Sequence, residues 1–168
     1  MNKNKGFTLI EVLLYLLIVA TFAGAVSTLL VMGFQARVKN KIMAEVDEQG
    51  IQIMSIMLAS SRLARTVSFP PPGGSGPVLR LSEPDPAFDP SVFDLSGGVI
   101  TLAEGATPPL PLNNNLVTAA GLYVSNLSPV GTPGSVKIQF TLAYKNPEGR
   151  PGYNYSKTFF SGATLRGN

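Results

Sequence analysis

The chain has 168 residues, which is enough for one anchored globular domain but too few for two full-sized ones. It contains no cysteine and no histidine, so disulfide bridges, thiolate metal sites and histidine-based nucleophile systems are excluded. We therefore expect no enzyme activity, no cofactor and no metal site. The formal net charge is only +3, and Lys3 and Lys5 supply part of it, so a nucleic-acid partner is not expected.

The chain begins with a short basic leader, residues 1–6, which ends in Lys5-Gly6. An apolar run follows from Phe7 to Phe34 and is long enough to span a bilayer as a helix. Glu11 is the only charged residue in this run. A carboxylate in a bilayer core costs roughly 2.5–3.5 kcal/mol or more. Glu11 therefore indicates a function in which a positive charge from another group pairs with this carboxylate.

The sequence Gly6-Phe7-Thr-Leu-Ile-Glu11, with the lysine before it and the apolar run after it, resembles the processing site of type IV pilins and type II secretion pseudopilins. The resemblance covers about the first thirty-five residues. It implies that a prepilin peptidase/methyltransferase cuts between Gly6 and Phe7 and methylates the new amine of Phe7. It also implies that Glu11 pairs with the N-terminal amine of a neighbouring subunit during assembly.

Two other interpretations of this segment remain open. An ordinary secretory signal would be cut after the apolar run, and Ala23-Gly24-Ala25 offers small residues at such a place. An uncut signal anchor would tolerate Glu11 near the membrane interface. In that case the protein would be an extracytoplasmic binding module that does not polymerise.

The predicted helix continues beyond the apolar run, because all 14 prolines lie at Pro70 or later. Residues 35–69 form its amphipathic continuation, and nothing interrupts a helix before about Val67. Gly24 and Gly33 either permit close helix packing or mark a stretch that unwinds during assembly. Gly50 indicates either a bend or a close approach to the sheet. An apolar stripe at helical spacing predicts the face that packs on this sheet: Ile42, Val46, Ile53, Met57 and Ala64, flanked by Met43, Met54 and Leu58.

Residues 70–168 are predicted to form the globular part as an antiparallel sheet. Alternating or β-prone segments predict strands over 78–82, 92–95, 99–103, 122–127, 136–144 and 153–165, the last with a bend at Gly162. The turn-rich residues 146–152 predict a hairpin between the last two. The predicted fold class is therefore α+β, with a long N-terminal helix packed on a C-terminal antiparallel sheet. This is the pilin-like architecture that the resemblance implies.

Three weaker motifs lie in the globular part. Oxygen-rich loops can bind calcium, but a solvated turn region is the favoured interpretation of the acids Glu83, Asp85, Asp89 and Asp94. Asn126-Leu-Ser is a formal glycosylation triplet. Aromatic residues near three cations could stack with single-stranded nucleic acid, but core packing is the favoured interpretation of Tyr144, Tyr153, Tyr155, Phe159 and Phe160, which lie near Lys145, Arg150 and Lys157.

We therefore expect a structural subunit, and a minor one, of a type IV pilus or a type II secretion-type pseudopilus. It would cross the bacterial inner membrane once, with residues 70–168 on the extracytoplasmic side, and enter a filament after processing. The expected partners are the peptidase, other pilin or pseudopilin subunits, the inner-membrane assembly platform and membrane lipid. The cations Arg37, Lys39 and Lys41 would contact lipid headgroups or neighbouring subunits, or lie on a solvated helix surface.

Overall fold

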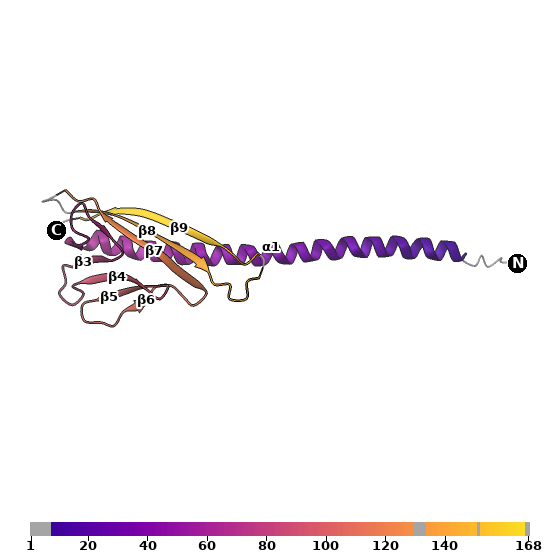
Figure 1. The fold of residues 1–168 in the computed structure, drawn as a ribbon, viewed down its shortest axis with the longest axis horizontal. Coiled ribbons are helices and arrows are strands. Elements are labelled where there is room, and N and C mark those ends of the chain that lie inside the picture. Colours follow the sequence, from indigo (N-terminus) through magenta and orange to yellow (C-terminus); the bar gives the residue numbers. More distant parts are fainter. Residues whose placement is uncertain (1–7, 130–133, 151, 167–168) are drawn as a thin grey trace. The chain divides into compact units, whose positions relative to one another are not determined.

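The computed structural model of the chain describes residues 8–129, 134–150 and 152–166. These residues fall into two compact units, one ending at Asn40 and one beginning at Lys41. The helix α1 (Leu9–Leu63) contributes its first part to unit 1 and its last part to unit 2. The nine strands of the described residues all belong to unit 2 (Figure 1).

In unit 2, α1 packs its predicted stripe against the strands. The confirmed stripe positions are buried, and two small residues join them on the same face: Ile42, Val46, Gly50, Ile53, Met54, Met57, Ser61 and, just after the helix, Ala64. Gly50 makes a close approach rather than a bend, because a Cβ at this position would overlap the Phe159 ring. That ring is stacked on Phe140, with 5.6 Å between the ring centroids. The missing side chain at Gly50 therefore lets the helix lie directly on the sheet.

The helix is shorter than predicted at its C-terminal end. It ends at Leu63, whereas the sequence pattern predicts a helix to about Val67 and a helical segment to residue 69. The N–H of Arg65 donates to the carbonyl of Ser82, and residues 66–69 then pair with residues 80–82. Val67 and its neighbours are β-prone, so strand pairing replaces the last helical turn.

The strands form two antiparallel sheets, whereas the sequence pattern predicted one. Sheet A contains, in spatial order, β1 (Thr66–Phe69), β3 (Leu79–Ser82), β4 (Ser91–Ser96), β5 (Val99–Glu104) and β6 (Leu110–Pro111). Sheet B contains β2 (Ser75–Gly76), β7 (Val117–Asn126), β8 (Ser135–Tyr144) and β9 (Ser156–Thr164). The predicted α+β class, with a long helix packed against antiparallel strands, is confirmed.

All six predicted strands are present, and β8 has the predicted alternation. Its inward side chains Val136, Ile138, Phe140 and Leu142 are buried. The predicted hairpin joins β8 to β9 in continuous register, and Gly162 pairs with Lys137 without the expected bend. β7 begins five residues earlier than predicted. The sequence pattern misses its first half because a register shift between Ala120 and Tyr123 breaks the alternation of the strand.

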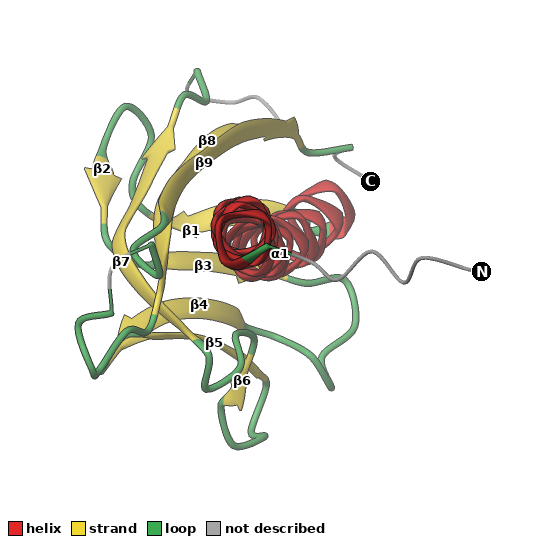
Figure 2. Cartoon of the chain, turned by 90° about the vertical axis from the view of Figure 1, so that its right-hand side faces the viewer, coloured by secondary structure: helices red, strands yellow, loops and turns green. Residues whose placement is uncertain are grey.

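Both sheets contribute to one core in unit 2, and the two are tied together by a buried asparagine. The side chain of Asn113 accepts a hydrogen bond from the N–H of Ile100 in β5 and donates one to the carbonyl of Val117 in β7. The backbone adds a second link, because the N–H of Ala119 donates to the carbonyl of Gly98. Figure 2 shows β8 and β9 curving past α1, with β3, β4 and β5 forming the second layer of strands.

Candidate functional site: the N-terminal segment of α1

The first turn of α1 is closed by a side-chain cap. Thr8 precedes the helix, and its hydroxyl oxygen accepts a hydrogen bond from the N–H of Glu11 at 3.3 Å. The carbonyl of Thr8 accepts bonds from the same N–H and from Val12. Threonine at the cap with glutamate three residues later is the capping-box pattern, which satisfies orphan donors at a helix start. Glu11 therefore lies in the first turn, close to the helix N-terminus.

The Glu11 side chain is half-buried and has a hydroxyl neighbour one turn further along the helix. The hydroxyl of Tyr15 donates to Oε1 of Glu11 at 3.5 Å, which is long for a hydroxyl donor, so this contact is weak. The positive end of the helix dipole also favours an acid in the first turn, by roughly 0.3–1 kcal/mol. No cation pairs with Glu11 among the residues that the structure describes. The carboxylate is thus positioned within unit 1 but not neutralised there.

The rest of the segment offers apolar surface and no further charge up to Phe34. Its leucine, isoleucine, valine and phenylalanine side chains are exposed; Phe22, for example, is 70% exposed. The stretch is long and apolar enough to cross a membrane, judged by length and composition. The hydroxyls of Ser27 and Thr28 donate to carbonyls four residues earlier, so they need no water. This surface is suited to lipid or to other apolar helices.

Two glycines leave flat positions on this apolar surface. A Cβ at Gly24 or at Gly33 would meet nothing within 4 Å. Small residues in membrane helices allow the backbones of neighbouring helices to approach closely. Each glycine therefore has space for a neighbouring helix.

Of the predicted processing and assembly residues, the structure describes only Glu11. Gly6 and Phe7 lie outside the described residues. Thr8 and Tyr15 are not among the predicted site residues, although the sequence carries a signal for each: the Thr-x-x-Glu spacing of a capping box, and a hydroxyl one helical turn after the acid.

The acidic loop residues serve mainly as local hydrogen-bond acceptors. Asp89 accepts from the N–H of Glu83, and Asp85 accepts from the N–H of Ala87. Burial raises the pKa of Glu83; a hydrogen bond from Ser91 opposes this shift, and neighbouring carboxylates add to it. Within the described ranges, no group of three or more acids is arranged to hold a metal ion.

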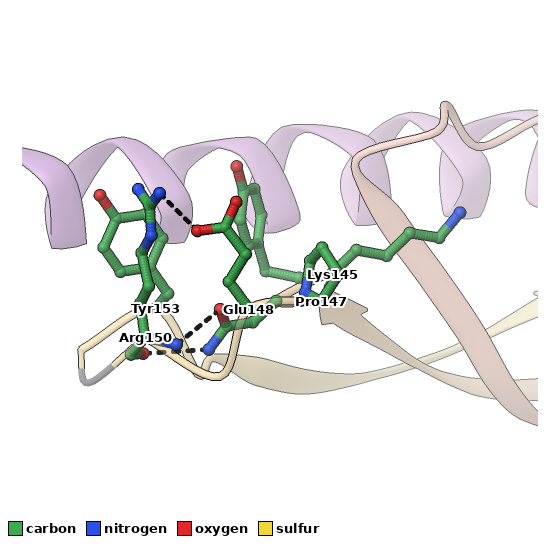
Figure 3. Close-up of a pocket in the computed structure, with 7 residues that line it drawn as sticks. Lys145, Pro147, Glu148, Arg150 and Tyr153 are labelled. Atoms are coloured by element: carbon green, nitrogen blue, oxygen red, sulfur yellow. Dashed lines mark hydrogen bonds and ion pairs between the residues drawn. The ribbon is translucent and has the colours of Figure 1, made fainter.

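The aromatic and basic residues near the last hairpin divide into separate contacts. Phe159 packs against α1, and Lys157 forms an ion pair with Asp47 at 2.9 Å. In Figure 3, Arg150 pairs with Glu148 and lies over the ring of Tyr153, and these residues line a small open pocket of 160 Å³. The Tyr153 and Glu148 hydrogen bonds raise the pKa of Arg150. Tyr144, Tyr155 and Phe159 pack against the core as expected, whereas Phe160 is 72% exposed, so the expectation of core packing is wrong for this residue.

The glycosylation triplet is not accessible. Asn126 is 1% exposed, and its amide nitrogen donates to the carbonyl of Pro70 at 2.8 Å. Its side-chain oxygen accepts from the N–H of Ser128. This asparagine is therefore part of the packing between β7 and the loop after β1.

The fold and the N-terminal segment each resemble those of one class of proteins. A long N-terminal apolar helix that packs its later part against antiparallel sheets is a pilin-like α+β fold. Residues 1–27 match the family model for the prokaryotic N-terminal methylation motif. This motif marks type IV pilins and pseudopilins, which are structural proteins, and it implies processing by prepilin peptidase. Searches of curated proteins and of solved structures gave no match for the chain.

Proposed function

We propose that the protein is a structural subunit, and a minor one, of a type IV pilus or a type II secretion-type pseudopilus. In this proposal the peptidase cleaves between Gly6 and Phe7, and the amine of Phe7 is methylated. Before assembly the subunit is anchored in the inner membrane, with unit 2 outside the cytoplasm. The assembly platform then transfers it into a filament. The absence of cysteine and the sheet region of roughly 100 residues support a minor rather than an abundant subunit.

The observation that carries the proposal is the placement of Glu11. It is a capped, half-buried carboxylate at the start of an exposed apolar helix, without a cationic partner in the described residues. Cleavage after Gly6 creates an amine four residues before it. In a filament the amine of one subunit can reach the carboxylate of the next, and the pair stabilises both charges in an apolar environment.

Substitution of Glu11 tests the assembly role. A charge-assisted hydrogen bond contributes ~1.5–3 kcal/mol, so Glu11→Gln should lower incorporation into sheared filaments by about tenfold or more. The amount of variant in the membrane fraction should stay unchanged or rise, because an acid has been removed from the apolar run. The measurement is the ratio of tagged subunit in the filament fraction to that in the membrane.

The matched control for this experiment is Glu48→Gln, which removes an exposed acid from the part of α1 in unit 2. It should leave the ratio unchanged. Equal incorporation of Glu11→Gln and wild type would refute the pairing role.

A further inference from the structure

Among the residues that the structure describes, strand β9 is a long free edge of sheet B. It pairs with β8 over nine residues in unbroken register, and sheet B ends with it. Edge strands of this length are templates for another strand, and proteins usually shorten, bend or charge them. The one charged side chain of β9, Lys157, is held by Asp47.

The register identifies which backbone groups of β9 are free. Tyr144 donates its N–H to Tyr155, and Leu165 donates its N–H to Gly134, at the two ends of the ladder. In an antiparallel pair the bonded residues alternate, so the odd-numbered residues of β9 bond to β8. The even-numbered residues direct their N–H and C=O groups away from β8. All five of these are exposed: Ser156, Thr158, Phe160, Gly162 and Thr164.

The side chains of these even-numbered residues lie on the outer face of the sheet. Phe160 pairs with Gln139, which pairs with Tyr123, so two exposed aromatic residues lie in one row across β9, β8 and β7. Phe160 is 72% exposed. Phe159 packs inward against Gly50 and Phe140. Its neighbour Phe160 points outward, so core packing does not explain why an aromatic residue stands there.

The next cross-strand row of β8 and β9 contains Lys137 beside a glycine, which has no side chain. Lys137 pairs with Gly162, which has no side chain to cover it. Lys137 takes part in no ion pair of the described residues. An open groove of 530 Å³ follows this part of the sheet and is lined by Leu127, Lys137, Phe160 and Gly162, among others. The groove therefore combines two exposed apolar walls with one unpaired positive charge.

We propose that β9 binds an extended acidic segment of another protein, which pairs with it antiparallel as a fifth strand of sheet B. The segment has an apolar side chain opposite Phe160 and a carboxylate opposite Gly162. Aromatic residues pair favourably with β-branched neighbours across strands. Two strand spacings, about 10 Å, separate the added strand from β8. The side chain of Lys137 and that of the added acidic residue extend toward each other across Gly162 and together span this distance, because no side chain of Gly162 lies between them.

The test uses the full chain in detergent micelles and a labelled nine-residue peptide. The peptide has valine opposite Phe160, glutamate opposite Gly162, and serine or threonine elsewhere. Fluorescence anisotropy should show saturable binding. N-methylation of the peptide at the residues that face the free N–H and C=O groups should abolish binding. N-methylation at the alternate residues, the matched control, should leave binding intact.

The charge contact is tested by exchange. Lys137→Glu should weaken binding about fivefold, and a peptide with lysine in place of its glutamate should recover the loss. Lys145→Glu, which reverses an exposed lysine outside the groove, should have no effect. These variants lie on exposed side chains, so folding is not at risk.

Three results would overturn the proposal. They are an absence of saturable binding, equal binding of the two N-methylated peptides, and a dimer of the full chain that forms through β9 and excludes the peptide. The last result would assign the edge to a second copy of this chain.

Discussion

The two units use apolar residues in opposite ways, although one helix runs through both. In unit 1 the apolar side chains of α1 surround the helix and are exposed; Phe22 is 70% exposed. In unit 2 the apolar stripe of α1 is buried, and Ile53 and Met57 are 0% exposed; Ile51 and Leu63, which lie off the stripe, stay exposed. The all-round pattern fits lipid or other helices, whereas the stripe fits a sheet. The position of apolar residues around a helix thus indicates its environment even where no partner is present.

Removal of a phenylalanine from each unit should give the largest difference. Phe140→Ala removes a fully buried ring from sheet B and should lower the free energy of unfolding of unit 2 by ~3–5 kcal/mol. Phe22→Ala should change it by less than about 0.5 kcal/mol, because its ring touches no core. Thermal unfolding followed by circular dichroism suits this comparison, as the chain has no tryptophan. Similar losses in the two variants would contradict the division into units.

A second comparison adds one methyl group to a glycine in each unit. Gly50→Ala places a Cβ against the Phe159 ring and should destabilise unit 2 by ~1–3 kcal/mol through overpacking. Gly24→Ala has open space around it and should leave the unfolding of unit 2 unchanged. The same thermal scans measure both variants. If the Gly50 variant unfolded like wild type, α1 would not lie as close to β9 as described.

Part of the fold could be predicted from the sequence alone, and part could not. The stripe around Gly50 and the alternation of β8 are periodic signals over several turns or strand residues, so both could be predicted. The division into two sheets could not, because strand order depends on contacts distant in the sequence. β2 and β6 have two residues each, too few for any period. The first half of β7 could not be predicted, because the strand is interrupted at Gly121, where φ is 61° and the alternation of side chains breaks.

The same limits apply to the N-terminal segment. Glu11 is conspicuous because it is a single charge in an apolar run. Thr8 and Tyr15 are ordinary residue types, and their contacts with Glu11 require the helical spacing to be applied to each neighbour in turn.

The smallest effect concerns the ion pair between β9 and α1 in unit 2. The hydrogen bond to Asp47 raises the pKa of Lys157 above its usual 10.5. The stabilisation is therefore fully present below pH 10.5 and is lost as the pH rises through the raised value. Lys157→Gln should lower the melting temperature slightly at pH 7, and the two curves should converge at higher pH. Melting curves that stay apart by the same amount above this range would contradict an electrostatic contribution.

The mass of the mature N-terminus tests the central claim most directly. The protein should be expressed in a host that has a prepilin peptidase, purified from membranes, and digested for mass spectrometry. We expect an N-terminal peptide that begins at Phe7 and carries one methyl group on its amine. An intact Met1, or a first residue after Ala25, would contradict it.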